Sequence, residues 1–206
     1  MVSDVKPTRS ELLLLKKKIT LAKSGHSLLK KKRDGLIIEF FKALELAKNI
    51  RAELVEEYKK ALQKMNTARA VESDLALKSL AMAVKDKPII ELETKNVMGV
   101  LVPKVRKGSL QKSLFQRGYG YVAGSIKTDE AVLAYEKLVE KVLAAAEYET
   151  VLKRLLEEID KTKRKVNALE KITIPRLESD ASYIRLRLEE IERENFSRLK
   201  HIKARV

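Results

Sequence analysis

The stretch LIIEFFKALELAKNIRAELVEEYKKALQKMNTARA, residues 36–70, decides the fold. Apolar residues recur in it at alternating steps of three and four, with charged residues between them. A stripe with a mean step of about 3.5 residues is typical of the seam between two coiled-coil helices. The stripe consists of Leu36, Phe40, Ala43, Ala47, Ile50, Leu54, Tyr58, Ala61, Met65 and Ala68. The stretch therefore predicts a long helix that pairs with another helix.

Signals at either side indicate where this helix begins and ends. Thr8 and Glu11 have the spacing of a capping box, in which both side chains accept hydrogen bonds from free backbone N–H groups. Pro88 restricts the residue before it and cannot donate a hydrogen bond to the preceding turn. We therefore assign residues 1–87 to an N-terminal shaft helix.

The middle of the chain, residues 88–127, has a different composition. It holds five of the seven glycines, two prolines and β-branched runs such as Val100-Leu101-Val102. These features predict a small β-hairpin or irregular foot with a glycine-rich loop. The segment Gly118–Ala123 matches the pattern GxGxxA, but no βαβ unit surrounds it, so we interpret it as a flexible loop without a cofactor.

A second shaft helix is predicted for residues 128–206. Thr128 is a candidate N-cap, and acidic residues follow it in the first turn. Pro175 removes one backbone donor, so we expect a kink or local break there without a domain boundary. The seam of the two helices is assigned to Phe40, Ala47, Ile50, Leu54, Met65, Val142, Leu152, Leu156, Ile159, Val166, Ile184, Leu188 and Ile191. The predicted fold is mainly all-α, a long antiparallel two-helix coiled coil with a small foot between the helices.

The residue types present leave little room for chemistry. Among 206 residues there is no Cys and there are two His, which excludes disulfides, thiolate chemistry and a His-rich metal site. No GxxxxGK[ST] loop occurs, and no nucleophile, base and orienting group stand together. We assign no catalytic, cofactor-binding or metal-binding residue and expect a non-enzyme in a reducing, cytoplasmic location. No segment approaches the ~20 apolar residues that span a bilayer, so any membrane association is expected to be peripheral.

The charge leaves two kinds of partner open. The net charge is +15, and residues 1–33 contain ten Lys and Arg against Asp4 and Glu11. A basic surface attracts acidic proteins or nucleic acid and does not by itself distinguish them. The alternative function is therefore a basic coiled-coil arm that binds structured nucleic acid, with a steep dependence on salt. A second alternative function is that of a chaperone-like or scaffold coiled coil.

Several segments resemble the family of D subunits of archaeal A-type and vacuolar-type rotary ATPases. They are PTRSELLLLKKKITLAKSGHSLLKKKRDGLIIEF (residues 7–40), NVMGVLVPKV (96–105), KTKRKVNALEKITIPRLE (161–178) and YIRLRLEEIERENFSRLKHIK (183–203). The last two carry the most weight, because they share the order and spacing of the family.

The resemblance implies a central-stalk rotor subunit that transmits torque between the nucleotide-processing hexamer and the ion-carrying ring of the membrane. It implies contacts with the catalytic and regulatory subunits, with the small F subunit and with the funnel-shaped C subunit, which is called d in vacuolar enzymes. The paired terminal helices would then enter the hexamer. Residues assigned to this hexamer-facing tip are Arg9, Lys16, Lys17, Lys18, Arg198, Lys200 and Lys203.

Overall fold

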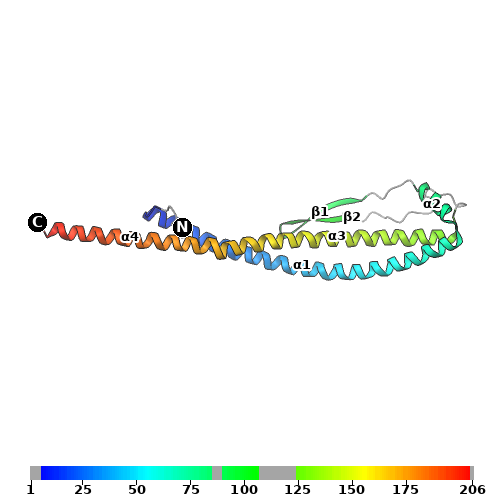
Figure 1. Cartoon of the computed structure of the whole chain (residues 1–206), viewed down its shortest axis with the longest axis horizontal. Coiled ribbons are helices and arrows are strands. Elements are labelled where there is room, and N and C mark those ends of the chain that lie inside the picture. Colours follow the sequence, from blue (N-terminus) through cyan, green and yellow to red (C-terminus); the bar gives the residue numbers. More distant parts are fainter. Residues whose placement is uncertain (1–5, 85–89, 107–123, 205–206) are drawn as a thin grey trace. The chain divides into compact units, whose positions relative to one another are not determined.

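The computed structural model describes residues 6–84, 90–106 and 124–204. Its elements are α1 (Arg9–Val71), α2 (Asp74–Ala83), β1 (Glu91–Val97), β2 (Val100–Arg106), α3 (Ile126–Ala168), the π-helical turn η2 (Leu169–Thr173) and α4 (Ile174–Lys203). Figure 1 shows that helices predominate, with a two-stranded hairpin between them in the chain. The predicted mainly helical fold with a small hairpin is therefore confirmed.

The chain divides into two structural units. The terminal unit consists of Met1–Gly35 and Ile159–Val206, and the hairpin unit consists of Leu36–Glu158. Each unit contains a stretch of α1 and an antiparallel stretch from the C-terminal half of the chain. Each is therefore described by itself.

The first helix begins as predicted but ends earlier. The Thr8 hydroxyl accepts a hydrogen bond from the Glu11 N–H at 3.3 Å, which satisfies a free donor of the first turn. The helix was expected to continue to residue 87, yet α1 ends at Val71. Ser73 then caps α2 by accepting a hydrogen bond from the Ala76 N–H at 3.3 Å. A serine that satisfies a new set of free donors explains why the helix stops without a proline.

The hairpin is closed by a tight turn at Met98 and Gly99. Both residues have positive φ angles, 50° and 87°, as a two-residue turn of type I′ requires. The Asn96 side chain accepts a hydrogen bond from the Gly99 N–H at 2.8 Å. The strands pair antiparallel, with Val97 opposite Val100 and Glu91 opposite Arg106.

The hairpin packs along α3. Val100 and Val102 are buried. The Arg154 guanidinium donates to the Leu101 carbonyl at 2.8 Å, and the Val105 N–H donates to Glu147 at 3.3 Å. Both polar contacts lie well inside α3. The predicted loop at residues 118–123 lies outside the described residues.

The N-terminus of α3 is capped by a residue other than the predicted Thr128. The helix begins at Ile126, and the Ser125 carbonyl accepts from the N–H groups of Thr128 and Asp129 at 3.0 and 3.2 Å. Thr128 lies in the first turn and is buried. The Ser125 N–H itself donates to the carboxylate of Glu72, just past the end of α1, at 2.6 Å. The two helices of the hairpin unit are thus joined where one ends and the other begins.

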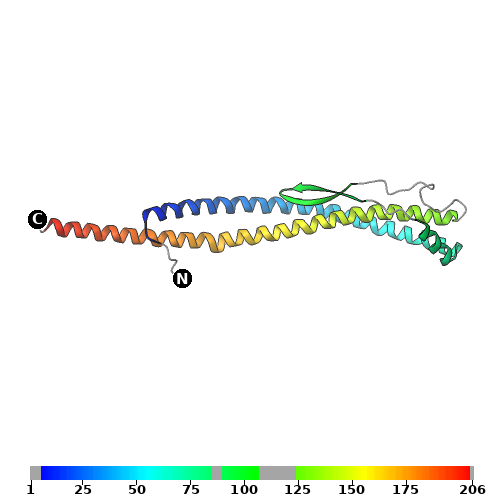
Figure 2. The ribbon, with the colours of Figure 1, turned by 90° about the horizontal axis from the view of Figure 1, so that it is seen from above.

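In the terminal unit the first part of α1 pairs antiparallel with the C-terminal helices, up to Glu192 of α4. Figure 2 shows the beginning of α1 alongside the helices at the C-terminal end. The contacts that mark the register are Arg9 with Glu192, Lys23 with Glu178 at 2.7 Å, and His26 with Glu170 at 3.7 Å. The buried residues are Leu15, Thr162, Val166 and Ile184.

The buried seam differs in phase from the predicted one along α3. Val166 and Ile184 are buried, and Phe40, Ala47, Ile50, Leu54, Met65, Leu152, Ile159 and Leu188 are half-buried. Val142, Leu156 and Ile191, also assigned to the seam, are exposed. Leu155 is 1% exposed, whereas its neighbour Leu156 is 47% exposed. The buried residues Leu155, Thr162 and Val166 are seven and four positions apart, as residues of one seam are. The prediction considered apolar residues only and therefore did not include Thr162.

The irregularity expected at Pro175 takes the form of the π-helical turn. The Ile174 N–H donates to the Leu169 carbonyl five residues earlier, so this turn holds one extra residue. Leu169 and Ile174 are both half-buried, which makes the seam step across the turn five residues. Pro175 then falls in the first two positions of α4, where a missing N–H is tolerated. The π-helical turn accommodates one extra residue, so the half-buried residues before and after it lie on the same face of the helix.

Candidate functional site on the terminal helices

The predicted basic residues of α1 lie on its first turns and are exposed. Arg9 forms an ion pair with Glu192 of α4. Lys16, Lys17 and Lys18 follow two turns later, and all three are exposed. Exposed ion pairs contribute little to stability, so Arg9 and Glu192 mark the register more than they hold the helices.

The other predicted basic residues lie on the end of α4, which extends beyond the start of α1 (Figures 1 and 2). Because Glu192 lies opposite Arg9, residues after Glu192 have passed the first turn of the partner helix. Arg198 pairs with Glu194 within α4 at 3.7 Å, and Lys200 and Lys203 are exposed in the last turns. At about 1.5 Å per residue, Lys203 lies ~16 Å along the helix from Glu192. The predicted tip residues therefore form two zones along the terminal unit.

Sequence reasoning missed the apolar residues of this projecting end. Phe196, Leu199 and Ile202 are all more than 60% exposed. Their three-residue spacing continues the apolar stripe of α4 past the point where α1 begins, and that spacing was the available signal. Exposed apolar side chains grouped in this way mark a surface that a partner covers.

A shallow groove lies between α1 and α4 near their paired ends. Arg9, Leu12 and Leu13 of α1 and Leu188 and Glu192 of α4 are among its lining residues. The lining combines leucines with charges of both signs. It is suited to a protein side chain more than to a small anionic ligand.

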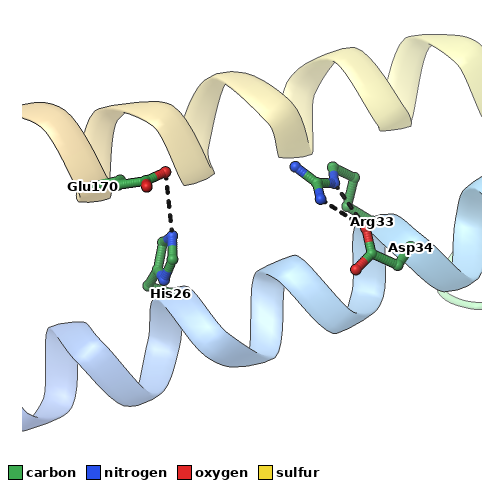
Figure 3. A network of polar contacts seen from close by, with 4 residues as sticks. All are labelled: His26, Arg33, Asp34 and Glu170. Atoms are coloured by element: carbon green, nitrogen blue, oxygen red, sulfur yellow. Dashed lines mark hydrogen bonds and ion pairs between the residues drawn. The ribbon is translucent and has the colours of Figure 1, made fainter.

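One histidine faces the opposite helix within the terminal unit. Figure 3 shows the His26 ring pointing at the Glu170 carboxylate of the π-helical turn, with Nε2 and Oε2 3.7 Å apart. Nε2 is buried and has no hydrogen-bond partner within normal distance. Nearby, Arg33 pairs with its neighbour Asp34 at 2.7 Å. His26 therefore occupies a seam position.

A hydrogen bond in the hairpin unit joins the end of α1 to the start of α3. The hydrogen bond from the Ser125 N–H lowers the pKa of Glu72 from its ordinary value of 4.5, because the donor stabilises the ionised carboxylate. On the exposed surface of α1, the hydrogen bond from Lys60 at 2.9 Å lowers the pKa of Glu57 in the same way. Glu72 binds groups at the start of α3 and Glu57 binds a lysine of its own helix, and we interpret both contacts as structural.

The described residues contain no cluster of three or more His, Cys, Asp or Glu that could hold a metal ion. In the same part of the chain, no helix is both long enough and apolar enough to cross a membrane. The candidate functional regions are therefore three surfaces: the basic first turns of α1, the groove, and the exposed end of α4.

Comparison with known proteins shows what this chain is similar to. The profile of the family described as the ATP synthase D subunit matches residues 11–204. The D subunit of the A-type ATP synthase of Methanosarcina acetivorans is 56% identical over 203 residues, which cover 98% of this chain and 97% of that protein. The protein of the same name from Halorubrum lacusprofundi is 48% identical and covers 99% of this chain and 90% of that protein. That of Archaeoglobus fulgidus is 46% identical, with 98% and 97% covered.

Identity at this level over both helices, the hairpin and the π-helical turn leaves no part of the fold unmatched. The resemblance inferred from residues 7–40, 96–105, 161–178 and 183–203 is confirmed. The chain belongs to the family of ATP synthase D subunits.

Proposed function

We propose that this chain is the central-stalk rotor subunit of an A-type ATP synthase, where it transmits torque between the nucleotide-processing hexamer and the membrane ring. The observation that carries the proposal is the match to D subunits of A-type ATP synthases over 98% of the chain. The helices suit the task, because packing of side chains between two paired helices resists bending and unwinding of each unit. Nucleotide chemistry then belongs to other subunits, and this chain is non-catalytic.

The terminal unit is the part that enters the hexamer. Its projecting α4 end carries four cations, Arg193, Arg198, Lys200 and Lys203, against Glu194. It also exposes an apolar set that the chain itself does not cover. The basic first turns of α1, at Arg9 and residues 16–18, complete this hexamer-facing surface. Long-range attraction to acidic partners would orient the rotor without fixing one rotational position.

The hairpin unit lies towards the membrane ring and binds the other stalk subunits. We assign the small F subunit to the exposed surface of α1 in this unit, where Ile38 and Phe41 are both more than half exposed. The funnel-shaped C subunit is assigned to the end that contains α2. Residues 1–87, 88–127 and 128–206 then serve as shaft, foot and shaft. The chain is cytoplasmic and peripheral to the membrane in this assembly.

The alternative, a basic arm that binds structured nucleic acid, rested on charge alone. Family membership gives the same charge a protein partner, and nothing else in the described residues favours nucleic acid.

Co-expression with the catalytic and regulatory subunits tests the proposal. We expect purification through a tag on the hexamer to recover one copy of this chain per hexamer. Failure of the full chain to co-purify, with salt-sensitive binding to nucleic acid instead, would overturn the assignment. A variant that lacks residues 193–206 serves as the comparison, because it keeps the described contact between Arg9 and Glu192 and should assemble more weakly.

A further inference from the structure

A second apolar stripe runs along α1 in the terminal unit, outside the seam. Leu14, Leu21 and Leu28 are spaced seven residues apart and are 49%, 74% and 67% exposed. Each directly precedes a residue that is buried or half-buried, as Leu14 precedes Leu15. Successive helical residues are rotated by about 100°, so the three leucines share one face beside the seam and do not contribute to it.

Gly25 follows Leu21 and precedes Leu28 at the border between this face and the seam, and it is half-buried. A Cβ built there would meet no atom of the chain within 4 Å, so packing within the chain does not require glycine. Glycine in a helix interior is less stable than alanine, and this position therefore carries a penalty that the isolated chain does not explain. A helix face without a side chain allows the backbone or a large side chain of another molecule to approach closely.

Lysines border the stripe along its length. Lys17 and Lys18 lie between the first two leucines, and Lys31 lies one turn beyond Leu28; all three are exposed. Two copies of this surface would repel one another, so a second copy of the chain is a poor occupant. Nucleic acid would engage the lysines through phosphates but would leave the leucines in water. A helix with apolar residues at seven-residue spacing and acidic residues beside them satisfies both features.

We propose that Leu14, Leu21, Leu28 and Gly25 form a docking seam for an acidic amphipathic helix of the hexamer, with Gly25 receiving its largest side chain. The inference rests on the proposed function and deepens it, because it names the rotor face that engages the stator and the chemistry of the engaged segment. The partner helix packs against α1 on the side that α4 leaves open.

Substitutions at Gly25 separate docking from folding, because the expected effects have opposite signs. Gly25→Ala and Gly25→Leu should raise the melting temperature of the free full-length chain by about 2–4 °C, since both residues favour the helix more than glycine does. Gly25→Leu should nevertheless weaken binding to the immobilised hexamer by about tenfold or more, because its side chain fills the gap. If Gly25→Leu binds as tightly as the wild type or more tightly, the surface is merely apolar and the docking seam is wrong.

The leucines are tested against a matched position on the same helix. Leu21→Ala with Leu28→Ala should weaken binding about tenfold or more, whereas Leu46→Ala should change it less than about twofold. Leu46 lies on α1 in the hairpin unit and is as exposed as Leu14, at 49%. Equal effects at the two places would overturn the inference while leaving the proposed function intact. Failure of the wild-type chain to bind the hexamer would overturn both.

The chemistry of the partner can be read directly. A photo-crosslinking residue placed at position 21 of the full chain should capture, in the assembled complex, a helical segment with acidic residues beside its apolar ones. Capture of a segment without acidic residues, or a product that nuclease treatment removes, would contradict the proposal.

Discussion

The hairpin unit and the terminal unit use the same kind of helix pair, but they hold it together differently. In the hairpin unit, β2 packs on α3 through Val100 and Val102, and Glu72 joins the end of α1 to the beginning of α3. In the terminal unit, the described contacts between helices are seam side chains and exposed ion pairs. We therefore expect the helix pair of the hairpin unit to contribute more to the stability of the free chain than that of the terminal unit.

The largest expected contrast comes from removing one residue in each unit. With Pro175→Ala in both variants, deletion of Lys171 from the π-helical turn should cost less than about 1 kcal/mol, because the five-residue step becomes a regular step of four. Deletion of Lys153 in the hairpin unit should cost at least about 4 kcal/mol, because it rotates Leu155 and Val166 out of the seam. Urea unfolding followed by circular dichroism measures both. Equal losses would show that the turn does not absorb a residue.

The phase of the seam in the hairpin unit is tested by two adjacent leucines. Leu155→Ala should destabilise the chain by about 2–5 kcal/mol, because it leaves a cavity between the helices. Leu156→Ala, with the side chain largely in water, should cost less than about 1 kcal/mol. The same unfolding experiment compares them. A larger effect at Leu156 would restore the seam first predicted from the apolar pattern.

The hydrogen bond from the Ser125 N–H to the Glu72 carboxylate makes the stability of the hairpin unit depend on pH. The pKa of Glu72 is lowered in the folded chain, so its contribution is fully present above the unfolded pKa and is lost as pH falls through the folded pKa, below 4.5. Glu72→Gln should cost about 1 kcal/mol at neutral pH, because an amide oxygen accepts the hydrogen bond of the Ser125 N–H less strongly than a carboxylate does. The difference between wild type and variant should shrink as the pH is lowered to about 3. A difference that stays constant would show that the carboxylate charge is not the cause.

The smallest effect is expected for an ion pair of the terminal unit. Glu178→Gln removes the contact with Lys23, whose side chain is 58% exposed, and should change stability by at most about 0.5 kcal/mol. A melting curve at low and at high salt measures it. A loss as large as that for Glu72→Gln would remove the distinction between the two units.

The sequence was sufficient for the large features, because they follow from local chemistry. The Thr8 cap, the hairpin around Val100–Val102 and the pairing of two long helices were all predicted. The end of α1 at Val71 was missed because no proline marks it, and Ser73 is one of many serines that can cap. Leu156 was assigned to the seam in place of the buried Leu155, because the assignment followed apolar residues only. The seam position seven residues after Leu155 is Thr162, which is buried but polar. The hydrogen bond of Glu72 joins it to Ser125, 53 positions away, and no local pattern shows such a contact.

The candidate surface was predicted only in its charges. Arg9, Lys16, Lys17 and Lys18 belong to one zone, and Arg198, Lys200 and Lys203 to another along the same unit. Their separation follows from the register of α1 on α4, which the ion pair of Arg9 with Glu192 shows and the sequence pattern did not fix. The leucine stripe could have been found from its seven-residue spacing, but its exposure required the structure.

Rotation of the chain within the hexamer tests the central claim most directly. Because the chain contains no cysteine, Leu92→Cys on the exposed face of β1 gives one site for an optical probe. With the hexamer fixed to a surface and ATP supplied, we expect stepwise rotation of the probe in one direction, with one labelled chain per hexamer. ATP hydrolysis by the assembled complex with a probe that does not rotate would contradict it.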